Sequence, residues 1–214
     1  MTRAPMWTVA SATAAPVLLI GGWTLAAALQ RDGFDQASGT ISALAALEAD
    51  HRWVMTTALV GTGIANVITA AGLHDAAVAG RCVHAIGGAA TVVVAAFPLP
   101  SGEERSAAHF AAAAVGFGAL ALWPLLSVRR SRQPASADPV TSRQPWGLRP
   151  AIVAGAGAVL VGTLAWFIAE LAADSDRVGV SERIAAGAQA MWPLAVVLST
   201  RVSRRRALRS ARRL

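Results

Sequence analysis

Six long apolar segments, separated by short polar stretches, run through this 214-residue chain. Most of them reach the ~20 residues that an α-helix needs to cross about 30 Å of hydrocarbon. A backbone in lipid must satisfy its hydrogen bonds internally, so each segment is expected to be helical. The pattern predicts an all-α polytopic membrane bundle, one domain over residues 1–200, with a basic tail at residues 201–214. The six predicted transmembrane helices cover about residues 7–29, 53–73, 83–99, 107–128, 148–172 and 182–200.

Composition supports the membrane assignment and excludes some classes of site. The chain is 55% hydrophobic and only 14% charged, whereas an average soluble domain carries about 25% charged residues. The net charge is +7, but the arginines flank the apolar segments, so membrane topology explains them better than nucleic-acid binding does. The single cysteine, Cys82, excludes an internal disulfide and a site with several cysteine ligands.

The arginines alternate between the two sides of the predicted bundle. Fourteen of the 19 lie at the N-terminus, in the loops after the second and fourth segments, and in the tail. Loops rich in Arg stay cytoplasmic, so both termini are predicted to be cytoplasmic and the protein to be multi-pass in the plasma membrane. The remaining loops, residues 30–52, 101–109 and 173–183, are then outside and hold most of the acidic residues.

An alternative for the first segment is a cleaved signal peptide. Arg3 precedes an apolar run that ends in Ala26-Ala27-Ala28, which is the general order of a signal sequence. The run is longer than the usual 7–15 residues of such a region, which favours a retained helix.

The small residues Gly61-Thr62-Gly63 and Gly87-Gly88 predict close contact between helices, since small side chains let backbones approach in lipid.

The first outer loop carries the densest polar pattern. Asp35, Ser38 and Ser42 are spaced i, i+3 and i+7, so they share one face if residues 36–47 form a short helix. Asp35 is also well placed to cap that helix, which by itself would explain an acid there. The functional alternative is a polar face turned toward the bundle. A serine acting as nucleophile would need a nearby base, and no GxSxG motif supports one.

Two histidines, His51 and His109, are predicted at the outer boundary. With Glu103 and Glu104 nearby, they suggest a zinc-type metal site or a general base. No HxxxH or HxxE pair supports a metal, and each histidine could simply bond a loop carbonyl. A second pair, His74 and His84, flanks the loop after the second segment. Facing pairs of this kind are also what haem ligation requires.

Few polar side chains interrupt the apolar segments. Glu170 lies two residues before the outer end of the fifth segment, and Asn66 and Gln189 lie deeper in theirs. A carboxylate at the edge of the hydrocarbon needs a partner or water, and we expect Glu170 to pair with Arg183. One acid and two amides are too few to suggest an ion or proton pathway.

Short motifs along the chain resemble those of the domain of unknown function 998 family. The resemblance covers about residues 16–198 and implies six helices with an outer polar cluster, but no established activity. It rests on Asp35, Ser38-Gly39-Thr40-Ile41-Ser42-Ala43-Leu44, Trp53-Val54-Met55, Phe97-Pro98, His109, Gly179-Val180-Ser181-Glu182-Arg183-Ile184 and Trp192-Pro193.

Three functions remain open at this point. The leading hypothesis is an outer pocket that binds a lipid or isoprenoid-like amphiphile through Ser38, Ser42, Asn66, Glu182, Arg183 and Gln189. The second is a membrane enzyme, either an acid catalyst resembling terpene cyclases or a metal-dependent lipid hydrolase, with Asp35, His109 and Glu170 as catalytic candidates and His51 with His109 as metal ligands. The third is a structural or assembly partner. Membrane lipids are the expected partners in each case, with no nucleic acid, and the cofactor and the oligomeric state stay undetermined.

Overall fold

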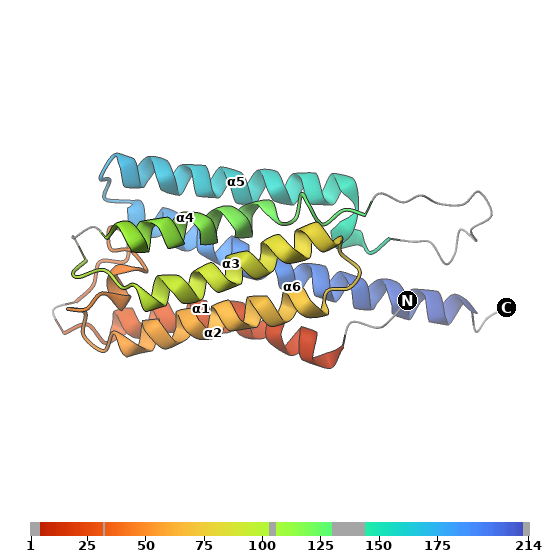
Figure 1. Cartoon of the computed structure of the whole chain (residues 1–214), viewed down its shortest axis with the longest axis horizontal. Coiled ribbons are helices and arrows are strands. Elements are labelled where there is room, and N and C mark those ends of the chain that lie inside the picture. The colour runs from red at the N-terminus through yellow and green to blue at the C-terminus, as the bar shows by residue number, and fades with distance from the viewer. Residues whose placement is uncertain (1–4, 32, 103–105, 130–143, 212–214) are drawn as a thin grey trace.

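The computed structural model describes residues 5–31, 33–102, 106–129 and 144–211, with side chains through residue 203. Within these residues the chain is all-helical and contains no strand. The six helices are α1 (Met6–Ala28), α2 (Trp53–Gly72), α3 (Val78–Ala96), α4 (Ala107–Leu122), α5 (Pro150–Ala172) and α6 (Val178–Ala211), and two short 3-10 turns are η1 (Ala43–Ala45) and η2 (Trp146–Leu148). Figure 1 shows these helices running along the long axis of the molecule.

Four of the helices, α1, α2, α3 and α5, are long and apolar enough to cross a membrane. Helix α4 is equally apolar but has only 16 residues. Many large apolar side chains on these helices are exposed, such as Val17, Ile64 and Val159. Such a surface suits contact with lipid chains rather than water, and together with the four candidate spans it makes the chain a multi-pass membrane protein.

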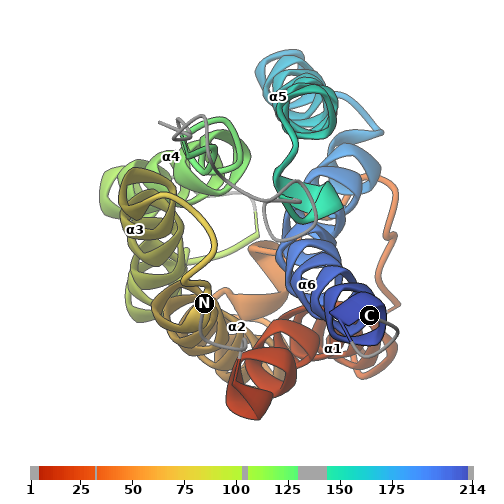
Figure 2. The same ribbon diagram turned by 90° about the vertical axis from the view of Figure 1, so that its right-hand side faces the viewer.

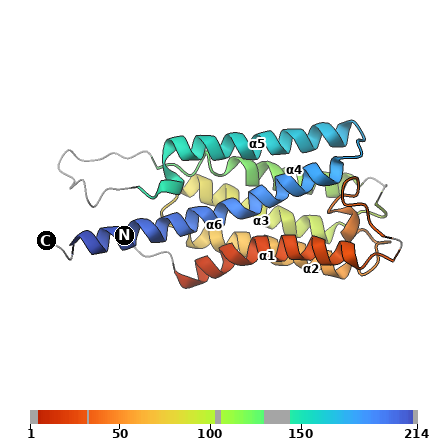
Figure 3. The same ribbon diagram turned by 180° about the vertical axis from the view of Figure 1, so that it is seen from behind.

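The first four helices pack in chain order, each against the next, and α6 packs against both α1 and α5. Helix α5 lies on the outside of the bundle, next to α6 and α4 (Figure 2). The connections gather at two ends, seen on opposite sides of Figure 3. We call one the loop end, with residues 29–52, 97–102 and 173–177. The other is the tail end, from which α6 extends beyond its neighbours (Figures 1 and 3).

Three helix boundaries differ from those expected from hydropathy. Helix α3 begins at Val78 rather than at residue 83, because Arg81 donates its side-chain N–H groups to the carbonyls of Ala70 and Ala71 and is thereby tolerated in the helix. Helix α4 ends at Leu122, since Pro124 has no N–H with which to continue it. Helix α6 runs from Val178 to Ala211, so its apolar part forms one helix with most of the basic tail.

The contact between α2 and α3 confirms the close packing expected from the small residues. A Cβ atom built on Gly63 would lie 2.5 Å from the carbonyl oxygen of Gly88, and one on Gly88 would lie 2.7 Å from that of Gly63. The two backbones therefore touch, and dispersion contacts between them replace contacts with lipid. The crossing sits beside Asn66, whose Cβ would be 2.9 Å from a side chain at position 88.

Candidate functional site

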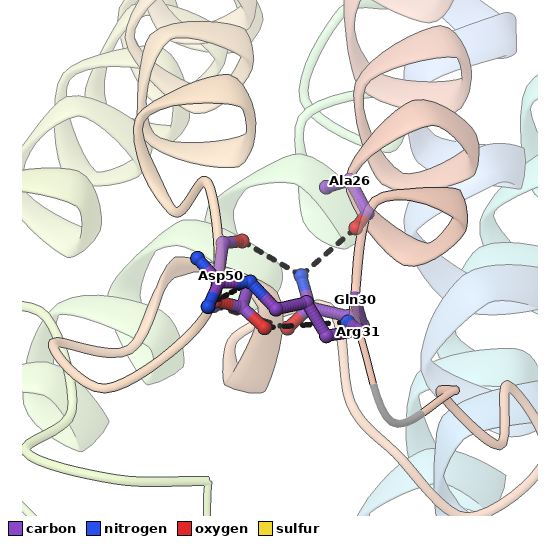
Figure 4. A network of polar contacts seen from close by, with 4 residues as sticks. All are labelled: Ala26, Gln30, Arg31 and Asp50. Atoms are coloured by element: carbon purple, nitrogen blue, oxygen red, sulfur yellow. Dashed lines mark hydrogen bonds and ion pairs between the residues drawn. The ribbon is translucent and has the colours of Figure 1, made fainter.

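The loop between α1 and α2 is fastened where it leaves and re-enters the bundle. Gln30 Nε2 donates to the carbonyls of Ala26 (2.9 Å) and Asp50 (2.8 Å), and the Asp50 N–H donates to Gln30 Oε1 at 3.2 Å. The Arg31 N–H donates to the Asp50 carboxylate, and Arg31 Nε lies 3.4 Å from it (Figure 4). These contacts hold the two ends of the loop side by side.

The middle of the loop forms turns and the short η1, and not the continuous helix over residues 36–47 on which a shared face of Asp35, Ser38 and Ser42 depends. Asp35 Oδ1 accepts the Ala37 N–H, and its Oδ2 accepts the Ser38 hydroxyl, both at 2.8 Å. These two bonds, chiefly the one to Ala37, hold the pKa of the exposed Asp35 carboxyl below its usual range. Short polar side chains that bond nearby backbone favour turns over helix. Asp35, Ser38 and Ser42 therefore share no helix face.

Two adjacent residues of α6 clamp this loop from the side. The buried Glu182 carboxylate accepts the Ile41 N–H at 2.5 Å. Arg183 Nη1 donates to three carbonyl oxygens, those of Gln36, Gly39 and Gly179, at 2.8 to 3.0 Å. The Arg183 guanidinium also lies 5.8 Å from the centre of the Phe34 ring. The acid thus accepts a loop N–H, and one of the three guanidinium nitrogens donates to carbonyl groups, while Arg183 Nε and Nη2 are buried without a hydrogen-bond partner among the described residues.

Gly179 lets the first turn of α6 reach the loop backbone. A Cβ atom at this position would lie 2.3 Å from the Gly39 carbonyl oxygen and 2.7 Å from that of Gln36. One residue later, the Val180 N–H donates to the Ala37 carbonyl at 3.1 Å. The Gly179–Ile184 motif and the Asp35–Leu44 motif, far apart in the chain, are therefore one structural unit.

A serine and a histidine meet beneath the same loop. Ser42 Oγ lies 3.0 Å from His109 Nε2, and His109 Nδ1 lies 2.9 Å from the Phe97 carbonyl oxygen. His109 stands in the first turn of α4, where Ser106 caps the helix by accepting the His109 N–H at 3.4 Å. The histidine is buried, with 3% of its surface exposed. A carbonyl only accepts, so Nδ1 carries the ring proton, and Nε2 accepts the Ser42 hydroxyl.

A cavity of about 70 Å³ lies inside the bundle, under the loop. Five helices and the loop contribute to its wall, while α5 does not. Four predicted ligand-binding residues, Ser42, Asn66, Glu182 and Gln189, are in the wall, and the other two, Ser38 and Arg183, are not. Gln189 Nε2 donates to the Phe117 carbonyl at 3.1 Å, which leaves its amide oxygen as an acceptor. The rest of the wall is mainly apolar and includes Leu19, Leu59, Val94, Phe117 and Leu120.

The two predicted acid catalysts lie away from this cavity. Asp35 is in the exposed turn with both oxygens engaged. Glu170, on α5, accepts the Trp166 Nε1–H at 2.7 Å. The described residues contain no ion pair between Glu170 and Arg183, so the predicted pair is wrong. The reason is that Arg183 finds backbone carbonyls much nearer to its own helix end.

The remaining histidines do not gather around a metal. His51 is exposed at the end of the loop, with a φ of 50°, and Glu103 and Glu104 lie outside the described residues. Among the residues described, no group of three or more His, Cys, Asp or Glu is placed to hold a metal ion. His84 is fully buried, bonds Asn66 through Nε2 at 3.0 Å, and stacks on Trp123 with ring centres 4.6 Å apart. His74, by contrast, is exposed.

The bond from His109 to a loop carbonyl confirms one of the alternatives from the sequence, but the sequence did not identify Phe97 as the residue that provides this carbonyl. Phe97 ends α3 with a φ of −118° and a ψ of 68°, so its carbonyl is not used by the helix. The signal was present in Phe97-Pro98, because a residue before proline is pushed out of helical conformation. The sequence did not indicate which side chain that carbonyl would accept.

Comparison with known proteins adds a family and no activity. Residues 13–199 match a family described as “Protein of unknown function (DUF998)”. No curated protein and no solved structure matches the chain. The matched range contains all the residues of the cavity wall and both motifs that form the loop clamp.

Proposed function

Because the chain belongs to the family described as “Protein of unknown function (DUF998)”, which assigns no activity, we propose from the site itself that the protein binds the polar end of a membrane amphiphile. The observation that carries the proposal is the cavity wall, which combines Ser42, Asn66, Glu182 and Gln189 with large apolar side chains. Lipids and isoprenoid-like molecules have the same division into one polar end and an apolar body.

The energetic argument concerns the buried polar groups. Asn66 and Gln189 are each 1% exposed, and Glu182 is 3% exposed. Each makes a hydrogen bond within the protein and has the capacity for at least one more, because amide and carboxylate oxygens each carry two lone pairs. A ligand with a hydroxyl or amine at its end would donate to the acceptors in the wall, and an ester carbonyl would accept from an amide N–H group there. The cavity holds several times the ~10–15 Å³ that one water molecule needs, so the polar end of a ligand fits inside.

We infer that the bundle crosses the plasma membrane six times with both termini in the cytoplasm. Fourteen of 19 arginines then lie on the cytoplasmic side, in agreement with the positive-inside tendency. The loop end faces outward in this arrangement, and the cavity lies beneath it. Reporter fusions at Leu214 and within residues 33–47 test the topology. We expect a cytoplasmic signal from the first fusion and an external signal from the second; either result reversed would contradict it.

Ligand binding is tested by narrowing the cavity. Gly116 is in the wall, and a Cβ atom there would meet its nearest neighbour, Ala90 Cβ, at an ordinary 3.6 Å. Gly116→Ala therefore adds a methyl group to the cavity without a clash. Gly118→Ala is the matched control, because it is on the same helix, has nothing within 4 Å of a Cβ atom, and gains the same helix propensity.

The measurement is native mass spectrometry of each purified protein, with released molecules identified by lipid analysis. We expect the wild type and Gly118→Ala to retain the same amphiphile and Gly116→Ala to lose most of it. Equal retention by all three proteins would show that any bound lipid sits elsewhere and would overturn the proposal. Thermal melting of the three proteins confirms that each remains folded.

A further inference from the structure

Ser42 and His109 have the geometry of a nucleophile and its base. Ser42 Oγ is 3.0 Å from His109 Nε2, within the 2.6–3.2 Å range in which a base takes a proton from an attacking group. The Phe97 carbonyl holds the proton on Nδ1, so the lone pair of Nε2 faces the serine. In serine hydrolases a carboxylate performs this orienting function, and here a neutral carbonyl does.

The serine is positioned to meet a bound molecule, since Ser42 is part of the cavity wall and His109 is on the side of Ser42 away from the cavity. Ser42 belongs to the cavity wall, whereas His109 does not. Ser42 precedes η1 but makes no capping hydrogen bond with its side chain. Its hydroxyl is therefore committed to His109 rather than to local backbone, unlike the hydroxyl of Ser38, which bonds Asp35.

We propose that Ser42 is a catalytic nucleophile, activated by His109, that accepts the acyl group of a carboxylic ester bound in the cavity. The proposal rests on the proposed function, because the ester would be the polar end of the bound amphiphile. The products are the alcohol portion of the amphiphile and a carboxylic acid.

The steps balance with water as the only co-reactant. Ser42 Oγ attacks the ester carbonyl carbon while its proton moves to His109 Nε2. The bond from that carbon to the alkoxy oxygen breaks, and the departing alcohol takes the proton from Nε2. Water then attacks the acyl-serine and gives a proton to Nε2, and the carboxylic acid leaves as the Ser42 hydroxyl re-forms. The Nδ1–H bond to Phe97 persists throughout and stabilises the charged ring.

The backbone N–H groups next to Ser42 influence the expected rate of ester hydrolysis, because such groups can stabilise the oxyanion of the intermediate. The N–H of Ile41, next to Ser42, is occupied by the Glu182 carboxylate at 2.5 Å. This bond occupies a backbone donor beside Ser42, so Glu182 would compete with the oxyanion of an ester intermediate for it. Losing one such donor slows related enzymes by about 10²–10³. The test therefore uses a fluorophosphonate. Its fluoride leaves more readily than the alkoxide of an ester does, so even a slowly reacting serine can be detected.

The experiment is labelling of the full-length protein, purified in detergent, with a fluorophosphonate probe. Reaction forms a bond from Ser42 Oγ to phosphorus and releases fluoride, while the proton passes through His109 to buffer. We expect a single labelled peptide that contains Ser42. Ser42→Ala should abolish the label, His109→Gln should slow labelling by about 100-fold or more, and the matched control Ser38→Ala should react like the wild type.

Two results would overturn the proposal: no label on Ser42 in the folded wild type, or equal labelling rates in wild type and His109→Gln. Thermal melts establish that each variant is folded, and Ser42→Ala alone decides the site if His109→Gln does not fold. Amphiphile retention is measured on the same samples. An unreactive protein that still retains its amphiphile refutes the nucleophile while leaving the binding function in place.

Discussion

His109 and His84 stand behind opposite parts of the same cavity, and each touches one residue of its wall. His109 faces the hydroxyl of Ser42, and His84 faces the amide of Asn66. Both rings are buried, and in each the nitrogen that meets the wall residue is Nε2. In the proposed reaction, the two histidines differ in the chemistry of their partners, a hydroxyl for His109 and an amide for His84, and not in burial or in being part of a helix.

The surroundings of the two rings also differ. His109 is oriented by a backbone carbonyl at the end of α3, in a region where loops meet. His84 is stacked on Trp123 with an angle of 14° between the rings, and neither its Nδ1 nor Trp123 Nε1 has a hydrogen-bond partner among the described residues. An amide neither gives nor takes a proton under ordinary conditions. The His84 cluster is therefore expected to serve packing.

The sharpest test of this contrast compares His109→Gln with His84→Gln. We expect His109→Gln to slow fluorophosphonate labelling of Ser42 by about 100-fold or more, since general-base catalysis contributes 10²–10⁴. His84→Gln should leave labelling within a factor of about 3, because His84 makes no hydrogen bond to Ser42 or His109 and is not part of the cavity wall. It should instead lower the melting temperature, because a stacked ring is lost from a filled site. The reverse assignment of the two effects would contradict the comparison.

The His84 cluster depends on the crossing of α2 and α3, so Gly88→Ala should destabilise the whole bundle. The added methyl group would lie 2.7 Å from the Gly63 carbonyl oxygen and 2.9 Å from Asn66 Cβ. Overpacking of this kind costs about 1–3 kcal/mol. The measurement is thermal or denaturant unfolding in detergent. Gly21→Ala, in open space on α1, is the control and should melt like the wild type; an equal loss in both proteins would show that the crossing is not special.

The loop end should respond locally to the corresponding change, Gly179→Ala. Its methyl group would lie 2.3 Å from the Gly39 carbonyl oxygen and would force α6 and the loop apart. We expect faster hydrogen exchange at the N–H groups of Ile41 and Val180, with a smaller loss of melting temperature than Gly88→Ala causes. Unchanged exchange in residues 36–42 would show that the clamp does not hold the loop.

Glu170 and Arg183 should behave as independent residues, because they share no partner. Glu170 bonds Trp166 on its own helix, and Arg183 bonds the loop and Gly179. In thermal melts of Glu170→Gln, Arg183→Gln and the double variant, we expect the two shifts to add, with the smaller one from Glu170. If the melting-temperature shift of the double variant differs clearly from the sum of the two single shifts, Glu170 and Arg183 interact, and that result would contradict the absence of an ion pair between them.

The smallest expected effect is a pH dependence at Asp35. Its carboxylate accepts the Ala37 N–H and the Ser38 hydroxyl, and these bonds hold its pKa below the ordinary value. A lowered pKa contributes stability that is present above the unfolded value, about 3.9, and is lost as pH falls through the folded value. Hydrogen exchange at Ala37 should therefore rise, relative to neighbouring amides, only below about pH 4. Asp35→Asn should remove that dependence.

The helices could be read from the sequence, and so could several of the cavity residues. Continuous apolar runs between arginine-rich loops predict spans because lipid admits few other structures. Asn66 and Gln189 stand out because polar side chains are rare in such runs, and Ser42 and Glu182 stand out because they belong to polar stretches of sequence between the apolar runs. The short helix over residues 36–47 failed because Asp35 and Ser38 satisfy the backbone locally, and a turn competes with the first turn of a helix.

By itself, the sequence determined the all-helical membrane architecture and which residues are polar enough to require partners. Only the tertiary structure decided the partners. His109 joins Ser42, 67 positions away, and Glu182 joins Ile41, 141 positions away. Arg183 bonds carbonyl oxygens instead of Glu170. The physical reason is that many of these contacts are made by backbone N–H and C=O groups. Nearly every residue carries these groups, so residue type does not indicate which backbone N–H or C=O remains available for a tertiary hydrogen bond.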